Sequence, residues 1–124
     1  MMRLVLKSLL LLIYLELIMR FSQFKRLHSL VRRQRVLSRP KGRRSVEDVC
    51  HAVDLACAFY FKPVLCLQRS AAATVLLRRH GWSAQMVIGL QVLPFKSHAW
   101  VELGGTVVND KPYMPEIYRE LERV

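Results

Sequence analysis

The sequence predicts an α+β fold in which helices come first and a small antiparallel sheet follows. Apolar residues recur at helical spacing from the N-terminus to about residue 80. After Gly81 they fall into short runs bounded by glycine and proline, as strands do. At 124 residues the chain has material for one modest hydrophobic core. Helices followed by neighbouring strands are typical of the α+β class.

The first helical segment is expected over residues 3–36, with a break near residues 21–23. Residues 4–19 are strongly apolar, but only about eight uncharged residues separate Lys7 from Glu16, against the roughly 20 that a membrane-spanning helix needs. A secretory signal is not expected, because charged residues follow the apolar run and no small-residue cleavage site appears. We therefore expect a helix whose apolar side packs on the domain or on a partner. A helix lying on a membrane surface is the second interpretation, and a spanning anchor is the third.

Positive charge is concentrated in the N-terminal third. Residues 1–44 contain twelve Lys and Arg and one acidic residue, whereas residues 45–124 contain eight of each, so the formal net charge of +11 lies in the first segment. Residues 38–44 hold a proline, a glycine and four basic residues, which is typical of a linker. We expect a basic, apolar helical segment with its linker over 1–44 and a neutral domain over 45–124. Because the basic character belongs to one arm, no nucleic-acid partner is expected.

Two helices are expected between this linker and Gly81. The first begins at Ser45, which has the position of an N-cap with Asp48 three residues on, and it ends before Pro63. The second begins at Cys66 and is closed by Gly81.

The expected strands cover residues 84–90, 97–103 and 106–110. Pro94-Phe95 reads as a loop or an edge, and the last two strands form a hairpin around Gly104-Gly105. The tail from Pro115 is expected to be a short, charged helix.

Three residues have the chemistry of a thiol hydrolase or acyltransferase. Cys66 begins a helix, where the free backbone N–H groups favour a thiolate and can stabilise an oxyanion. His98, on a following strand, can take the thiol proton and return it to a leaving amine. Asp110, at the end of the next strand, can fix the histidine tautomer. We predict these three as nucleophile, general base and acid, and orienting carboxylate.

The hairpin register tests this prediction. If Gly104-Gly105 formed a simple two-residue turn, Asp110 would face Ala99, and its side chain would lie on the opposite face of the sheet from His98. A three-residue loop over 103–105, with its last glycine left-handed, would instead place His98 opposite Asp110. We predict this second register.

Each of these residues also has a purely structural interpretation. A cysteine between leucines is often a small buried hydrophobe, and Cys50 and Cys57 on an apolar helix face are expected to be that. His98 also fits an ordinary sheet histidine, and Asp110 an ordinary turn residue. The cysteines and histidines lack the spacing of a zinc site and no phosphate loop occurs, so neither metal nor cofactor is expected. Three cysteines at irregular spacing favour a reducing cytoplasm.

Short motifs around these residues occur in a dense order along the chain. They are Cys66-Leu67-Gln68-Arg69-Ser70, Leu76-Leu77-Arg78-Arg79-His80-Gly81, Val87-Ile88-Gly89, Pro94-Phe95 and His98-Ala99-Trp100-Val101-Glu102. Over roughly residues 45–112 the chain resembles the lasso peptide biosynthesis B2 proteins, which belong to the transglutaminase-like (papain-like) cysteine protease superfamily. The resemblance implies a papain/transglutaminase-like fold with the nucleophile helix packed on the sheet. It also implies that Cys66, His98 and Asp110 are nucleophile, base and orienting acid.

The resemblance implies a leader peptidase. Such proteins cut the leader from a ribosomally made precursor, which frees the core peptide for macrolactam closure by a separate ATP-dependent cyclase. Some members carry an N-terminal winged-helix-like recognition domain, whereas the N-terminal third here is helical and short. This departure implies the split form, with a separate leader-recognition (B1) protein as partner. The N-terminal helix would then dock that protein or the cyclase.

Two other functions remain open at this point. The same three residues serve acyl transfer, as in transglutaminases, when an amine outcompetes water. A non-catalytic module would instead bind a membrane surface or nucleic acid through residues 20–44, with steep salt dependence and an unreactive Cys66. The favoured location is the cytoplasm, with membrane association through the N-terminal helix as the alternative.

Overall fold

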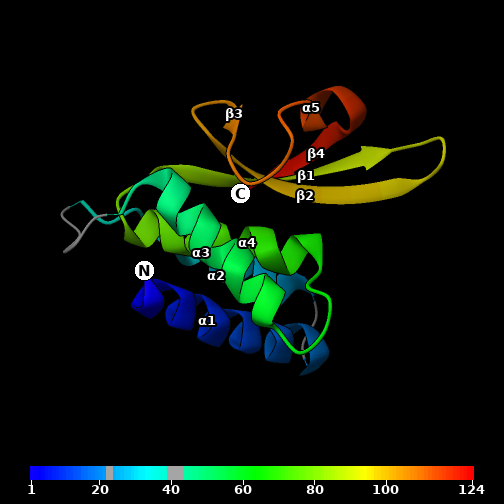
Figure 1. The fold of residues 1–124 in the computed structure, drawn as a ribbon. Coiled ribbons are helices and arrows are strands. Elements are labelled where there is room, and N and C mark those ends of the chain that lie inside the picture. Colours follow the sequence, from blue (N-terminus) through cyan, green and yellow to red (C-terminus); the bar gives the residue numbers. More distant parts are fainter. Residues whose placement is uncertain (22–23, 39–43) are drawn as a thin grey trace.

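The computed structural model describes residues 1–21, 24–38 and 44–124. A layer of helices packs against a small sheet, as Figure 1 shows. The helices are α1 (Met2–Phe21), α2 (Phe24–Arg33), α3 (Val46–Phe59), α4 (Cys66–Arg79) and the short α5 (Met114–Ile117). The strands are β1 (Ala84–Gln91), β2 (Lys96–Leu103), β3 (Thr106–Val107) and β4 (Arg119–Arg123), all antiparallel in the order β3-β2-β1-β4. The predicted α+β class is confirmed.

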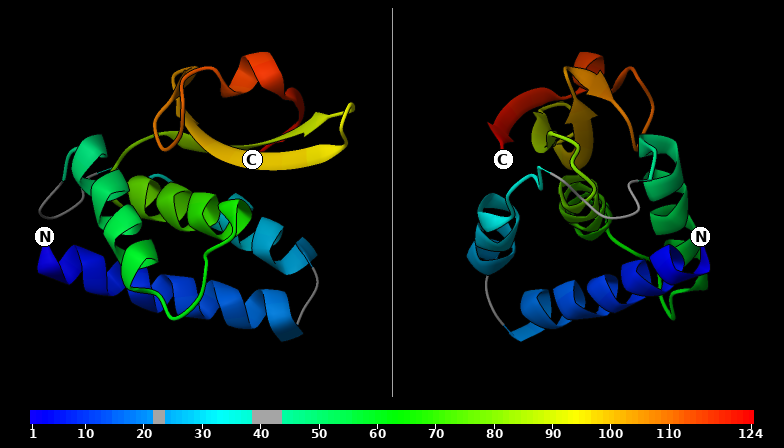
Figure 2. Two further views of the ribbon diagram at one scale, coloured as in Figure 1. Left: turned by 45° about the vertical axis from the view of Figure 1, so that its right-hand side comes forward. Right: turned by 90° about the vertical axis from the view of Figure 1, so that its left-hand side faces the viewer.

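Helix α4 lies between the sheet and the other long helices (Figure 2). It contacts β1 and β2 on one side and α1, α2 and α3 on the others. Every residue from Ser70 to Arg78 is buried, and the consecutive alanines at 71–73 let the neighbouring elements approach its axis closely. Helix α4 is therefore the fixed element against which the residues of the candidate site are placed.

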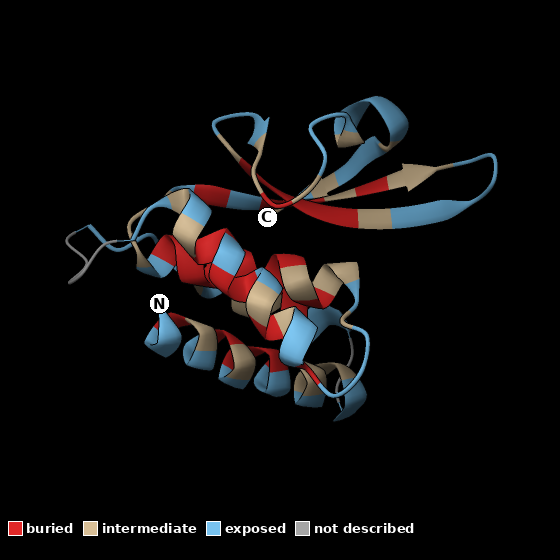
Figure 3. Cartoon of the chain, viewed as in Figure 1, coloured by how far each residue is buried: buried red, intermediate tan, exposed pale blue. Residues whose placement is uncertain are grey.

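Helix α1 shares the core of α3 and α4. Leu12 and Leu15 are fully buried, and the side-chain amide of Gln68 on α4 donates to the backbone carbonyl of Leu12 at 2.8 Å. Figure 3 shows the buried side of α1 turned toward the other helices and its outer side exposed. The structure thus agrees with the first interpretation of this segment, a helix packed on the domain. Within residues 1–21, 24–38 and 44–124, none of the helices has both the length and the apolar character that crossing a bilayer requires.

The helical segment expected over residues 3–36, with a break near residues 21–23, comprises two helices, α1 and α2. They flank residues 22–23, which lie outside the described residues, and α2 ends at Arg33. Residues 39–43, most of the predicted linker, also lie outside the described residues. The predicted domain boundary that follows this linker stays a prediction.

A buried arginine closes the C-terminal end of α4. The guanidinium of Arg78 donates to four backbone carbonyls in the described part of the chain, those of Val31, Gln34, Ala84 and Val124. Burial lowers the pKa of this guanidinium from its ordinary value. Because the carbonyls belong to α2 and its end, to β1 and to the residue after β4, Arg78 joins the helical layer to the sheet.

The C-terminal tail differs from the sequence prediction. In place of a short charged helix from Pro115, the structure has the single turn α5 and then strand β4, which pairs with β1. Glutamate, leucine and arginine favour helix by themselves, but pairing with β1 satisfies the backbone groups of this segment. Arg123 adds ion pairs to Glu102 at 3.0 Å and Glu120 at 2.7 Å. Tertiary pairing therefore overrides the local preference.

Candidate active site

Cys66 is the first residue of α4, and its side chain is half-buried. The preceding Leu65 has the extended backbone of an N-cap (φ −72°, ψ 149°), and within the described residues its side chain makes no capping hydrogen bond. The first turn contains no acidic residue. The backbone N–H groups at the start of α4 therefore have no competing anion from their own turn, and a thiolate on Cys66 would lie at the positive end of the helix.

His98 and Asp110 form a close pair. Nε2 of His98 lies 2.6 Å from Oδ2 of Asp110, and both side chains are largely buried. Burial alone would raise the pKa of Asp110, but the hydrogen bonds from His98 and from the Lys111 backbone N–H lower it overall, helped by the charges of His98 and Arg69. The ionised carboxylate holds Nε2 of the imidazole as a donor, which leaves Nδ1 for proton exchange.

Aromatic rings fix the plane of the imidazole. The His98 ring stacks on Tyr118 with centroids 5.3 Å apart and on Trp100 with centroids 6.3 Å apart. Gly89 lies opposite His98 in the sheet, and a Cβ built there would come within 2.8 Å of both Trp100 and Tyr118. The ring cluster therefore depends on a residue without a side chain at position 89.

The predicted hairpin register is wrong, although the predicted pair of side chains forms. Glu102 faces Val107 and Leu103 faces Thr106, so Gly104-Gly105 is a two-residue turn. Both glycines are left-handed, with φ of 59° and 83°, and such a turn matches the twist of the flanking strands. The odd loop expected over 103–105 does not exist.

The irregularity that turns Asp110 toward His98 comes after the turn. Val108 still donates to the carbonyl of Val101 at 2.9 Å, but the N–H of Val101 donates to the side-chain Oδ1 of Asn109 at 2.7 Å. A side-chain amide thus takes the place of a backbone carbonyl in the ladder. The backbone leaves β3 at this point, and Asp110 is no longer held to the register of the hairpin.

Side chains of α4 hold the segment around Asn109 in place by hydrogen bonds. Ser70 Oγ donates to the carbonyl of Ala99 at 3.1 Å and accepts from Asn109 Nδ2 at 3.2 Å. The guanidinium of Arg69 donates to the backbone carbonyl of Asn109 at 2.6 Å. Ser70 lies about 6 Å, or one helical turn, beyond Cys66 on the same side of α4. The start of α4 is thereby fixed against the neighbours of both His98 and Asp110.

The other two cysteines, Cys50 and Cys57, are inside α3, so neither lies at the first residue of a helix as Cys66 does. Cys50 is buried, and burial, with a smaller contribution from Asp54, raises the pKa of its thiol to about 11. Burial also raises the pKa of the Cys57 thiol. In the part of the chain that the structure describes, no group of three or more His, Cys, Asp or Glu residues is placed to hold a metal ion.

Comparison with known proteins identifies the family. The model of the transglutaminase-like superfamily matches residues 9–123, which is nearly the whole chain. The chain belongs to the transglutaminase-like superfamily. It is also 47% identical over 49 residues to the microcin J25-processing protein McjB of Escherichia coli, a stretch that covers 40% of this chain and 24% of McjB. No solved structure matches. The resemblance predicted from the motifs is confirmed by these two matches.

Three positioning residues were missed from the sequence: Arg69, Ser70 and Asn109. The available signals were a serine directly before three consecutive alanines and an asparagine directly before the predicted acid. An asparagine side chain can accept and donate at once, which is what the break in the ladder requires. The hydrogen-bond partners of Ser70 and Arg69 are far away in the sequence, so the positioning roles of these residues can be recognised only once the fold is known.

Proposed function

We propose that this protein is a cysteine peptidase that removes the leader from a ribosomally made lasso peptide precursor before macrolactam formation. The observation that carries the proposal is the His98–Asp110 pair, fixed by Ser70 and Asn109 against the helix that Cys66 begins. Membership of the transglutaminase-like superfamily and the similarity to a microcin J25-processing protein support the same reaction class.

In the proposed reaction, Nδ1 of His98 takes the proton of the Cys66 thiol. The thiolate attacks the carbonyl carbon of the scissile peptide bond, and the backbone N–H groups at the start of α4 stabilise the resulting oxyanion. The imidazolium, paired with Asp110, returns the proton to the leaving amine, which is the new N-terminus of the core peptide. The leader remains on Cys66 as a thioester. Water, deprotonated by His98, then hydrolyses this thioester and restores the free thiol.

The proposed reaction requires no metal or cofactor. The partners proposed with it are the precursor peptide, a separate leader-recognition protein and the ATP-dependent cyclase that uses the freed amine. We place the reaction in the cytoplasm, where a catalytic thiol stays reduced.

The test is precursor cleavage by Cys66→Ala, measured by mass spectrometry with the recognition protein present. We expect cleavage to fall to background while circular dichroism and thermal unfolding remain those of the wild type. Cys57→Ala is the matched control, because this half-buried cysteine on α3 has no role in the proposed reaction. Continued cleavage by Cys66→Ala would end the proposal.

Acyl transfer is the second candidate, and superfamily membership favours it. The thioester is the same, but an amine replaces water in the second half of the reaction. Adding a primary amine such as glycine methyl ester distinguishes the two. A peptidase gives the free leader acid, whereas an acyltransferase gives the leader amide, with a different mass.

A further inference from the structure

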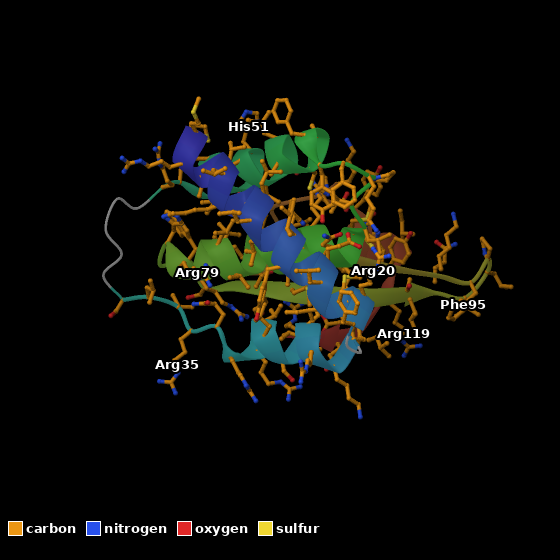
Figure 4. All side chains as sticks on the ribbon, turned by 90° about the horizontal axis from the view of Figure 1, so that it is seen from below. Arg20, Arg35, His51, Arg79, Phe95 and Arg119 are labelled. Carbon is orange, nitrogen blue, oxygen red and sulfur yellow. The ribbon has the colours of Figure 1, made fainter. Side chains whose placement is uncertain are left out.

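The face of the helical layer turned away from the sheet carries a groove between α1 and α2, with α4 at its bottom. Two cavities of about 710 and 570 Å³ lie along it. They share the lining residues Tyr14, Leu30, Gln34 and Arg79, so they are two parts of one groove. Figure 4 looks onto this face, with the labelled Arg79 on α4 visible between α1 and α2.

The groove has an apolar lining that is open to solvent. Leu10 and Tyr14 of α1 line it, and they are 60% and 52% exposed. Leu30 of α2 lies on the other wall, and the buried Leu76 of α4 forms part of the floor. Exposed apolar side chains beside a recess of this size are typical of binding surfaces.

The charged residues of the groove are basic. Lys7, Arg26, Arg33 and Arg79 line the two cavities, and none of the described lining residues is acidic. Arg79 lies on the exposed surface and donates to the neutral amide oxygen of Gln34 at 3.2 Å.

Two titratable residues near the groove, His80 and Glu16, also indicate that its surroundings are positively charged. Burial lowers the pKa of His80, and the charges of Lys7 and Arg44 lower it further, as a positive environment does. Glu16, the one acidic residue of α1, is paired with Lys62 at 2.6 Å. The groove therefore combines apolar surface with basic side chains, and its described lining contains no carboxylate.

We propose that this groove binds an amphipathic helix of a partner protein, with an apolar stripe against Leu10, Tyr14 and Leu30 and with carboxylates facing Lys7 and Arg79. A helix with its side chains is about 10–12 Å across, so its apolar residues can enter a recess between two helices. Carboxylates on its flanks complement the basic lining and speed association.

The arrangement disfavours a bilayer and a second copy of the chain. A bilayer would contact the outer face of α1, where Leu6, Ile13 and Leu17 are exposed, and these three residues line neither cavity. A second copy would bring like charges together, because this segment is strongly basic.

The groove is separate from the candidate active site. It lies along Val75, Leu76 and Arg79 of α4, which are about 14–20 Å from Cys66 by the rise of the helix, and on the face turned away from the sheet. A bound helix therefore leaves the start of α4 accessible to substrate. The inference rests on the proposed function for the kind of partner, a component of the processing complex.

The test uses an 18-residue fluorescein-labelled peptide with leucines at helical spacing and glutamates elsewhere. Its binding to the full chain carrying Cys66→Ala is measured by fluorescence anisotropy, so the result does not depend on cleavage. We expect binding that Leu10→Glu and Arg79→Glu each weaken at least tenfold. Leu6→Glu, at an equally exposed position of α1 outside both cavities, and Lys25→Glu, with the same charge change on α2 outside both cavities, should each change affinity less than threefold.

A comparison peptide with lysines in place of glutamates and vesicles of phosphatidylglycerol complete the experiment. The lysine peptide should bind at least tenfold more weakly. Equal binding of both peptides, equal effects of groove and control substitutions, or no binding of the glutamate peptide would overturn the inference. Vesicle binding that Leu6→Glu abolishes and Arg79→Glu leaves intact would also overturn it, in favour of a membrane surface.

Discussion

Helices α3 and α4 have the same length and lie side by side, but they begin differently. At the start of α3, Ser45 Oγ accepts from the N–H of Asp48 at 3.1 Å, and Glu47 and Asp48 place negative charge in the first turn. At the start of α4, the side chain of Leu65 provides no acceptor, and the turn that follows contains no carboxylate. A side chain therefore caps the first backbone N–H groups of α3, whereas those of α4 have no side-chain cap.

This difference indicates that the start of α3 contributes to stability, whereas the start of α4 is available to an anion. A side-chain cap typically stabilises a helix by about 1 kcal/mol, and acidic residues in the first turn add to this. Helix α4 does without that stabilisation at its first residue, while its other end is held by Arg78. An open, acid-free helix start is available for a thiolate and for an oxyanion, which is the arrangement that the proposed reaction needs.

After Cys66→Ala, the largest effect is expected from Asp110→Asn. An amide can orient His98 wrongly and does not support the imidazolium, so kcat/KM for precursor cleavage should fall about 10²- to 10⁴-fold. Thermal unfolding and cleavage kinetics, measured on the same preparation, check this. A loss smaller than tenfold would mean that Asp110 is only a turn residue.

Leu65→Asp should make the start of α4 resemble that of α3. The new carboxylate would cap the first N–H groups and disfavour the Cys66 thiolate, so cleavage should fall about 10- to 100-fold while unfolding free energy rises by about 1 kcal/mol. Leu65 is 58% exposed, so the substitution should not disturb the core.

Leu65→Asn is the matched control for that substitution, since it supplies a cap without charge. It should stabilise the fold to a similar extent and reduce cleavage less. Unchanged cleavage by Leu65→Asp would show that the open helix start has no catalytic role.

Asn109→Ala should have an intermediate effect. It leaves the buried N–H of Val101 without its acceptor, which lowers the unfolding free energy by about 1–3 kcal/mol, and it frees Asp110 from its position. We expect kcat to fall about tenfold with KM little changed. Asn109→Asp, which can still accept from Val101, should recover part of the activity; equal losses in both variants would argue against this positioning role.

The smallest effect is expected from Ser45→Ala. Loss of the α3 cap should lower the unfolding free energy by about 1 kcal/mol in urea denaturation. Precursor cleavage below the unfolding transition should stay within twofold of wild type. A larger loss of activity would mean that the two helix starts are coupled.

The local part of the site could be predicted from sequence because it depends on nearby residues. The cap at Ser45, the start of α4 at Cys66 and the closing Gly81, whose φ is 85°, each follow from neighbours within four residues. The candidate catalytic pair was also named correctly as a contact, because residue types and element order brought His98 and Asp110 to one hairpin.

The two incorrect predictions, the hairpin register and the C-terminal helix, concern features that depend on contacts between residues far apart in the sequence. The predicted register assumes that the hairpin stays regular up to Asp110, but the side chain of Asn109 interrupts the ladder by hydrogen bonding to Val101 and Ser70. The residues of β4 prefer helix and therefore predict one, whereas pairing with β1 makes this segment a strand. A local pattern contains neither of these partners.

Gly89 limits how this protein can be altered. Because Gly89 has no side chain, Trp100 and Tyr118 can occupy the space above it and stack on His98. Even alanine there would displace the Trp100 ring or the start of the Tyr118 side chain, and the imidazole of His98 would lose a stacking partner. Random mutagenesis for new cleavage specificity should therefore recover few active variants at position 89, although this residue touches neither the thiol nor the carboxylate. The geometry of the candidate pair thus depends on a position that has no side chain, and a search restricted to reactive side chains would overlook it.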